Sequence, residues 1–404
     1  MTDSWAERAG PVVKEPVVAD ETRSPFDDVS LERLRARRST KWAAYPPDVL
    51  PAFIAELDVP LAEPVAAALH AAIDDGDTGY AAPGELGAAF AEFAAARLGW
   101  RLDPRRAFLV PDVVVGIAES LRLFSARGDG VVINSPVYPP FYAVVREVER
   151  HIVDVPLLRD GGGEWELDLA GLERAFAAGA RAYVLCSPHN PLGRVFAPAA
   201  LAAVAALARR YDVLVLADEV HAPLTLPGTV FTAFAPLAEA AGARCVALHS
   251  ASKAWNLAGL KCALVVAADE AVREGLRRLP VEARYRSGHL GVIASLAAFR
   301  DGVAWLDGLI AHLDRNRRLL AELLARELPA VGYAMPQASF LAWLDCRALG
   351  LGDDPAKAFL QRGRVALTSG MAYGPGGAGH ARLNMGTSAA LLGEAVARMR
   401  RATA

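Results

Sequence analysis

The stretch "LHSASKAWNLAGLKCALVV" (residues 248–266) has an apolar run at each end and Lys253 among small hydroxyl residues in its middle. Short apolar runs of this kind are typical of strands buried on both faces of a sheet. A lysine is almost never fully buried unless it is paired or covalently bound. Lys253 is therefore either a solvated residue of the turn between two strands or an amine with a lowered pKa that can form a Schiff base. This stretch alone leaves both interpretations open.

The sequence on either side alternates between strand-like and helix-like patterns. Short β-rich runs are "GVVINS", "RAYVLCS", "YDVLVLAD", "RCVALHS" and "CALVVAA", and helical spacing follows in segments such as "LAGLERAFAAGA" and "PAALAAVAALARR". This alternation predicts an α/β fold, with a mostly parallel sheet covered by helices. After about His289 the pattern predicts a long amphipathic helix over 292–327, which Gly302 could interrupt, and then a strand in "SFLAWLDC".

We divide the chain into four segments on these patterns. Residues 1–30 read as a polar, proline-punctuated arm, 31–58 as a segment that joins the small domain, 59–290 as a large domain and 291–404 as a smaller α+β domain. The N-terminus has no signal-peptide core and no run of 18 apolar residues occurs, so we expect a cytoplasmic protein without membrane association.

The composition excludes several classes of partner. The net charge of -3 over 404 residues gives no basis to expect nucleic-acid binding. The four cysteines are scattered without CxxC spacing, which predicts buried reduced thiols, and we expect no metal ligands. We interpret Cys262, although it is close to Lys253, as a small residue of the core.

Polar residues follow four of the predicted strands. They are Tyr138, Asn190, Asp218 with His221, and Lys253. Each has a structural explanation on its own: a turn at Asn190, a helix cap at Asp218 and a half-buried pocket for His221. Ligands of open α/β sheets bind outside the carboxyl ends of the strands, so we expect these side chains to meet at one site.

The residue types at this edge fit one cofactor. A lysine can hold an aldehyde as an imine, an aspartate can keep a pyridine nitrogen protonated, an asparagine can bond a phenolic oxygen and an aromatic ring can stack. This set indicates pyridoxal 5'-phosphate (PLP). Its phosphate needs N–H groups at a helix N-terminus, hydroxyls and cations, which "VPDVVVGIAES" (110–120), Ser250, Ser252 and Lys261 can supply.

Several motifs resemble one family. "SPHNPLGRVF", "ADEVHAPL" and "HSASKAWNLAGLK" resemble, in this order, the class I/II aminotransferases of fold type I. "TKWAAYPPDVLPAFIAELDVPLAEPV" (40–65), "TGYAAPGELGAAF" (78–90) and "RLNMGTS" (382–388) are most similar to the cystathionine β-lyase-like MalY/PatB branch of carbon–sulfur lyases. The resemblance covers roughly residue 31 to the C-terminus. It implies the aspartate aminotransferase-like fold, a large and a small domain, and PLP.

Residue roles follow from the resemblance. Lys253 would hold the cofactor and, with Tyr138, form the catalytic pair. Asp218 would pair with the ring nitrogen, Asn190 and His221 would lie near the phenolic oxygen, and Tyr138 would stack on the ring. Tyr138 and Asn190 would also contact the substrate.

The resemblance also assigns the remaining contacts. Tyr80 would reach the phosphate of the neighbouring subunit in a homodimer with shared sites, and Arg382 would bind the substrate α-carboxylate as a two-donor fork. The phosphate would be held by backbone N–H groups, hydroxyls and one cation, those of Val113, Val114, Ser250, Ser252 and Lys261.

The chain departs from the branch at three places. It has Pro223 where the branch often has aspartate, and a Thr-Ser pair at 387–388 where the branch has cysteine and proline. It also has Leu-Asp at 57–58, preceded by Glu56, where methionine and aspartate are typical. We expect substitutions at these places to alter substrate choice rather than cofactor binding.

These observations predict a PLP-dependent carbon–sulfur β-lyase that converts cystathionine or a related L-cysteine S-conjugate to thiol, pyruvate and ammonia. The alternatives are an aminotransferase on the same scaffold and a specialised biosynthetic carbon–sulfur lyase, because the core residues begin all three reactions alike. A regulatory protein that binds a transcription factor through its surface is a further interpretation. It would need an exposed apolar patch.

Overall fold

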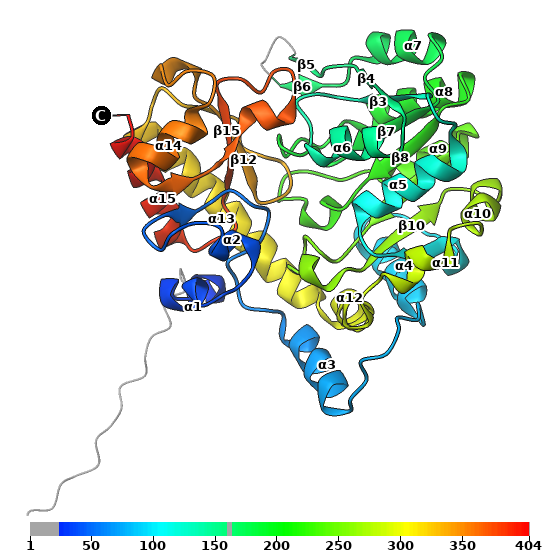
Figure 1. The fold of residues 1–404 in the computed structure, drawn as a ribbon, viewed down its shortest axis with the longest axis horizontal. Coiled ribbons are helices and arrows are strands. Elements are labelled where there is room, and N and C mark those ends of the chain that lie inside the picture. Colours follow the sequence, from blue (N-terminus) through cyan, green and yellow to red (C-terminus); the bar gives the residue numbers. More distant parts are fainter. Residues whose placement is uncertain (1–23, 160–163, 404) are drawn as a thin grey trace, which may run out of the picture.

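The computed structural model describes residues 24–159 and 164–403, and its largest element is a seven-stranded sheet (Figure 1). From edge to edge the strands are β2 (Ala107–Val110), β10 (Ala263–Ala267), β9 (Cys245–His249), β8 (Leu214–Asp218), β7 (Ala182–Cys186), β3 (Gly130–Ile133) and β4 (His151–Asp154). The five strands from β9 to β4 run parallel, whereas β10 is antiparallel to both of its neighbours. The carboxyl ends of β3, β7, β8 and β9 therefore meet at one edge.

Both faces of this sheet are buried, which explains the uninterrupted apolar runs of its strands. Along β8, Leu214 and Leu216 pack into one apolar cluster and Val215 and Ala217 into another. The first face is covered by α5 (Val113–Phe124), α6 (Pro140–Glu147) and α10 (Glu270–Leu276). The second is covered by α4 (Leu86–Arg97), α7 (Leu169–Ala177), α8 (Pro198–Arg210), α9 (Phe234–Ala241) and α12 (His289–Asp301).

A single glycine separates α12 from the long helix α13 (Val303–Glu327). The carbonyl oxygen of Gly302 accepts a hydrogen bond of 3.0 Å from the indole Nε1 of Trp255. A Cβ atom at Gly302 would lie 2.6 Å from that nitrogen and 2.7 Å from the carbonyl oxygen of Ala298. The expected interruption of the helix near Gly302 is therefore present, and close packing explains the glycine.

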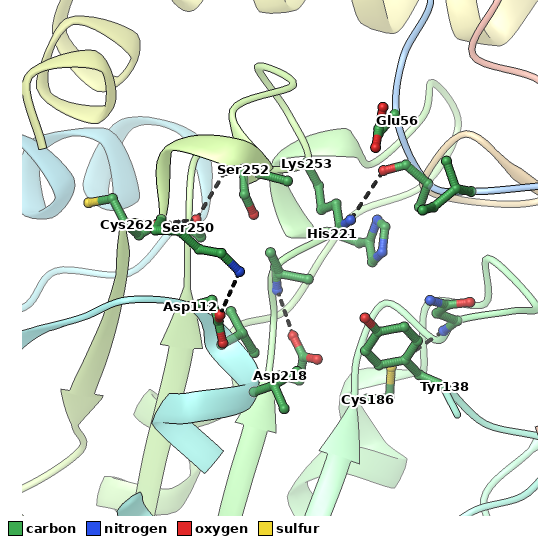
Figure 2. A pocket seen from close by; sticks show the side chains of 18 of the residues that line it. Glu56, Asp112, Tyr138, Cys186, Asp218, His221, Ser250, Ser252, Lys253 and Cys262 are labelled. Atoms are coloured by element: carbon green, nitrogen blue, oxygen red, sulfur yellow. Dashed lines mark hydrogen bonds and ion pairs between the residues drawn. The ribbon is translucent and has the colours of Figure 1, made fainter. Parts of the chain in front are cut away.

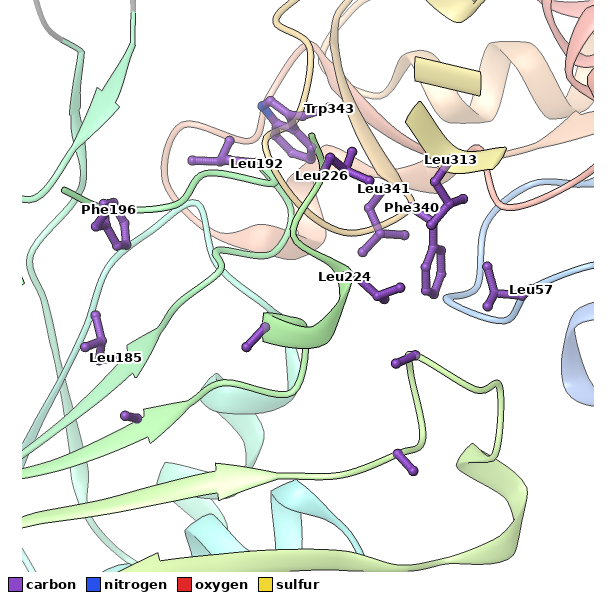
Figure 3. Packing of buried hydrophobic residues seen from close by; sticks show 14 of the residues in the cluster. Leu57, Leu185, Leu192, Phe196, Leu224, Leu226, Leu313, Phe340, Leu341 and Trp343 are labelled. Carbon is purple, nitrogen blue, oxygen red and sulfur yellow. The ribbon is translucent and has the colours of Figure 1, made fainter. Parts of the chain in front are cut away.

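The C-terminal part forms a second, antiparallel sheet beside α13 (Figure 1). Its apolar residues join those of the large sheet, and Figure 3 shows Leu57, Leu224 and Phe340, from three separate segments, around one apolar region. The strands, in order, are β11 (Gly332–Tyr333), β12 (Leu341–Asp345), β15 (His380–Asn384) and β14 (Thr368–Ser369), with helices α14 (Pro355–Gly363) and α15 (Ala389–Arg401).

The N-terminal segment packs against this second sheet. It contains α1 (Leu31–Arg35), α2 (Thr40–Ala43) and β1 (Leu50–Pro51), and β1 pairs in parallel with β13 (Val365–Ala366). Lys41 lies 2.7 Å from Asp58, with side chains only 1% and 3% exposed, and Trp42 donates to the same carboxylate at 2.9 Å. The lysine and tryptophan of the "TKWAAYPP" motif thus fix the chain near residue 58.

Between these parts, α3 (Glu63–Asp74) extends outward from the body of the molecule (Figure 1). The remaining elements are the hairpin β5 (Leu158–Arg159) and β6 (Trp165–Glu166) and the short helix α11 (Val281–Tyr285). Most of the expected N-terminal arm lies outside the described residues. Within its described part, Phe26 is buried against Trp305 and His312.

The expected α/β fold with a mostly parallel sheet is confirmed, as are all five quoted strand runs and the strand in "SFLAWLDC". Sequence patterns missed β2, which is short and ends before a proline, and the edge strand β4, whose side chains are partly exposed. Over the described residues, none of the helices has the length and apolarity needed to cross a membrane.

Candidate active site

A cavity of about 340 Å³ lies at the carboxyl edge of the large sheet. Its walls come from the ends of β3, β7, β8 and β9, the N-terminus of α5, residues 54–56 and Arg382 of β15 (Figure 2). The predicted site residues that line it are Val113, Val114, Tyr138, Asn190, Asp218, His221, Ser250, Ser252, Lys253, Lys261 and Arg382. The cavity thus brings together segments that are far apart in the sequence.

Lys253 follows β9 and points into this cavity (Figure 2). Its Nζ donates a hydrogen bond of 3.1 Å to the carbonyl oxygen of Ala55. Burial, and next the positive charge of Arg382, lower the pKa of Lys253 to about 8, against the opposing effect of the carboxylates of Glu56 and Asp218. A substantial fraction of this amine is therefore neutral near pH 8, as a nucleophile or base requires.

Asp218 is the last residue of β8 and is also buried. Its Oδ1 accepts a hydrogen bond of 3.2 Å from the backbone N–H of Val220. Burial raises the pKa of Asp218 to about 7, and neither that hydrogen bond nor the charge of Lys253 offsets the effect. A buried carboxyl of this kind is stabilised in its ionised form by a cation placed against it.

Arg382 and Asn190 are joined across the cavity wall. Nη1 of Arg382 donates to Oδ1 of Asn190 at 3.1 Å, and Nη2 donates to the carbonyl oxygen of Phe53 at 2.8 Å. The guanidinium lies over the ring of Tyr373, 5.4 Å from its centroid. Its Nε is buried and has no hydrogen-bond partner among the described residues. Nη2 also donates to the hydroxyl of Thr368 at 3.3 Å, so these contacts hold the guanidinium in one orientation at the cavity wall.

His221 and Tyr138 are both uncharged groups of this site. Burial, together with the charges of Lys253 and Arg382, lowers the pKa of His221 to about 3. The Nδ1 of His221 lies 3.0 Å from the hydroxyl of Ser339. Burial, with the charge of Asp218, raises the pKa of Tyr138 to about 12. The imidazole and the phenol can therefore act as neutral hydrogen-bonding and stacking groups.

The N-terminus of α5 forms the opposite end of the cavity. The carboxylate of Asp112 caps this helix by accepting from the N–H of Val115 at 2.9 Å. The N–H groups of the first turn, at Val113 and Val114, have no acceptor within the helix. Nζ of Lys261 lies 3.1 Å from Asp112, so a cation stands beside these N–H groups. This combination is suited to bind a phosphate.

Two serines complete this end of the cavity. The hydroxyl of Ser250 donates to the carbonyl oxygen of Cys262 at 2.6 Å and accepts from the N–H of Ser252 at 3.0 Å. Ser250 thus fixes the turn that carries Ser252 and Lys253. Figure 2 shows Ser250 and Asp112 on one side of the cavity and Glu56 on the other.

The chemistry of these residues fits PLP. A buried carboxyl with a raised pKa, a buried amine with a lowered pKa and a helix N-terminus with a neighbouring cation face one cavity. PLP presents a protonated ring nitrogen, an aldehyde and a phosphate, one group for each of the three. The amide nitrogen of Asn190 is left as a donor, because its oxygen accepts from Arg382.

One predicted site residue, Tyr80, does not line the cavity of its own chain. Its side chain is 83% exposed and contacts the ring of Tyr285 edge-on. Several further residues line it to which the sequence analysis gave no individual contact, among them Ala55, Glu56, Asp112 and Cys186. The motif "FIAELD" was the available signal for the first two, but no local pattern shows that residues 55 and 253 touch.

Cys262 also lines the cavity, although we interpreted it from the sequence as a core residue. It is buried, as are Cys186, Cys245 and Cys346, and none of the four forms a disulfide. Burial raises the pKa of Cys262 to about 11, so the thiol is neutral. Cys262 is therefore a small wall residue and not a nucleophile.

The departures from the branch lie mostly away from the cavity. Asp58 is paired with Lys41, Ser388 caps α15 by accepting from the N–H of Leu391, and Pro223 lies in a turn after β8. None of the residues at 57–58, 223 and 387–388 lines the cavity, whereas Glu56 does. Direct contact with a substrate is therefore open to Glu56 alone among them.

Comparison with known proteins agrees with this geometry. Residues 56–399 match the family "Aminotransferase class I and II". A Mycobacterium leprae protein named provisionally as a cystathionine beta-lyase is 48% identical, over 94% of this chain and 98% of its own length. The cystathionine beta-lyase of Corynebacterium glutamicum is 34% identical, over 91% of this chain and 98% of its own.

A solved structure shares both the fold and much of the sequence. It is a Corynebacterium diphtheriae protein described provisionally as a PLP-dependent beta-cystathionase, with a TM-score of 0.88 and 36% identity over 94% of this chain and 99% of its own. The chain belongs to the class I and II aminotransferase family, in its cystathionine β-lyase group of PLP-dependent carbon–sulfur lyases.

Proposed function

We propose that the protein is a β-lyase for cystathionine or a related L-cysteine S-conjugate. The reaction adds one water and gives a thiol, pyruvate and ammonia, and for cystathionine the thiol is homocysteine. The observation that carries the proposal is the buried amine of Lys253, with its pKa lowered to about 8, in one cavity with Asp218 and Arg382. The activity named for the relatives supports it.

When bound, PLP supplies an electron sink for the bond that breaks at the substrate Cα. Lys253 would hold the cofactor, and its amine would serve as the base that removes the Cα proton. The carboxylate of Asp218 would keep a proton on the ring nitrogen. Asn190 would donate its amide to the phenolic oxygen, with the neutral His221 beside it, and Tyr138 would stack on the ring.

Arg382 orients the substrate by binding its α-carboxylate. Its side chain lines the cavity, and Asn190, Phe53 and Thr368 hold its guanidinium in one orientation. A planar fork binds a carboxylate in one orientation, which a lysine ammonium cannot do. This contact would restrict the enzyme to free α-amino acids.

We also propose a cytoplasmic homodimer in which Tyr80 acts at the site of the neighbouring subunit. The side chain of Tyr80 is highly exposed, whereas site residues of its own chain such as Asp218 and Arg382 are buried. At the phosphate end, this partner hydroxyl would complete the contacts made by Val113, Val114, Ser250, Ser252 and Lys261.

We also propose the division of the chain at residues 30, 58 and 290. The pairing of β1 with β13 supports placing 31–58 with the small domain.

Incubation with L-cystathionine in the absence of any keto acid tests the activity. We expect pyruvate and homocysteine in equal amounts, and no pyruvate from a Lys253→Ala variant, because the amine that moves the Cα proton is gone. Product that forms only when a keto acid is added would show an aminotransferase instead. Pyruvate from other S-conjugates, but not from cystathionine, would indicate a specialised lyase.

Hybrid dimers test the shared site. Homodimers of Lys253→Ala and of Tyr80→Ala should both have low lyase activity. A co-expressed heterodimer of the two variants, by contrast, carries one intact site. We expect the purified heterodimer to have about half of the wild-type activity per dimer, since one of its two sites is complete. If Tyr80 acts in its own chain, every site of the heterodimer is defective and no activity returns.

The stability of the cofactor-free protein should depend on pH through Asp218. The pKa of this carboxyl rises from 3.8 to about 7 on folding, so the folded state binds the extra proton and loses stability as pH rises between these values. An Asp218→Asn variant lacks this loss. Its stability relative to wild type should increase from pH 4 to pH 7.5, by up to roughly 4 kcal/mol.

Urea unfolding of both cofactor-free proteins at the two pH values measures this difference. Adding PLP should stabilise the wild type more than the Asn variant at pH 7.5, because only the carboxylate pairs with a protonated ring nitrogen. An equal difference between the proteins at both pH values would mean that Asp218 is already paired within the fold.

A further inference from the structure

The carboxylate of Glu56 lines the cavity without a protein partner. No hydrogen bond or ion pair joins it to any residue in the described ranges 24–159 and 164–403. Its charge nevertheless raises the pKa of Lys253, and its effect is larger than that of the other carboxylate, Asp218. Arg37, a second cation on which it acts, already donates to the carbonyl oxygens of Leu57 and Val59. Glu56 is therefore available to a ligand in the cavity.

The backbone around Glu56 is firmly held, which fixes the point at which its side chain leaves the chain. The N–H of Glu56 donates to Ile54, and its carbonyl oxygen accepts from Nζ of Lys41 at 3.1 Å and from the amide of Asn384 at 2.6 Å. The next residue, Leu57, exchanges two hydrogen bonds with the side chain of Asn256. An acidic side chain on so rigid a support is pre-organised for binding.

Glu56 lies at the substrate end of the cavity. Figure 2 shows it on the far side of Lys253 from Asp112 and Ser250, which belong to the phosphate end. A substrate that reacts at Lys253 with its α-carboxylate on Arg382 must direct its sulfur substituent away from the phosphate. The wall in that direction includes residues 54–56, and Glu56 is the only one of these three with a charged side chain.

We propose that Glu56 determines specificity by binding a cationic group on the sulfur substituent, so that the enzyme prefers L-cysteine S-conjugates whose substituent carries an ammonium group. The inference rests on the proposed lyase function and narrows its substrate class. The distal ammonium of cystathionine is one such group. A neutral substituent gains nothing from this carboxylate, and an anionic one is repelled by it.

Three substrates of similar size separate the charge of the substituent from its bulk. They are S-(2-aminoethyl)-L-cysteine, which is cationic, S-propyl-L-cysteine, which is neutral, and S-carboxymethyl-L-cysteine, which is anionic. Each is tested with PLP-loaded wild type, Glu56→Gln and the control Glu32→Gln. Glu32 is an exposed acid of the same N-terminal segment that does not line the cavity.

The measured quantity is the ratio of kcat/KM for pyruvate release, cationic over neutral. We expect Glu56→Gln to lower this ratio about fivefold to tenfold and to improve the anionic substrate, as loss of one ion pair predicts. Glu32→Gln should leave the ratio as in wild type. A ratio that stays within about twofold of wild type in Glu56→Gln would overturn the proposal. An equal fall for all three substrates would overturn it too, because Glu56 would then act only on Lys253.

A binding measurement separates this proposal from the lyase function itself. Amino acids that enter the site change the absorbance of the bound cofactor, so the Kd of each conjugate can be measured even if no pyruvate forms. Absence of pyruvate from every conjugate with wild type would contradict the lyase function. The Kd values would still test the role of Glu56. We expect Glu56→Gln to weaken binding of the cationic conjugate relative to the neutral one about fivefold to tenfold, because one ion pair is lost.

Discussion

The active site depends on the burial of one amine and one carboxyl in a single cavity. Lys253 and Asp218 are both removed from water, and this desolvation is the largest cause of the shift in each pKa. At about 1.36 kcal/mol per pKa unit, each shift corresponds to roughly 3 to 4 kcal/mol. The fold sustains this cost through the large apolar layers on both faces of the sheet. A bound group that offers an aldehyde to the amine and a cation to the carboxyl removes much of it.

The active site also depends on the segment of residues 53–58, which forms the cavity wall that faces the strand ends. Its backbone carbonyls accept from Lys253, Arg382 and Asn384, and the ion pair of Lys41 with Asp58 secures its end. The same short segment therefore positions the reacting amine, orients the substrate fork and presents Glu56. Changes in this segment are expected to alter substrate choice without disturbing the phosphate end.

Sequence patterns predicted the sheet and most of the cavity because both depend on local information. Apolar runs that end in Asp218, or that precede Asn190 and Lys253, place polar groups at the ends of parallel strands. The contact of Lys253 with Ala55, by contrast, joins residues 198 positions apart through two parts of the fold. No periodicity encodes such a contact, and for the same reason the sequence did not show that Glu56 lines the cavity. The roles of the lining residues, and that of Tyr80, remain predictions.

Reduction of the holoenzyme with borohydride tests most directly whether Lys253 is the reacting amine. Reduction should fix the cofactor to the protein, and a modified Lys253 blocks tryptic cleavage after that residue. Mass spectrometry should then find the cofactor on the peptide of residues 245–261, which contains Lys253 internally. If the label is found instead on the peptide of residues 254–273, through Lys261, or if no label is retained, Lys253 is not the residue that holds the cofactor.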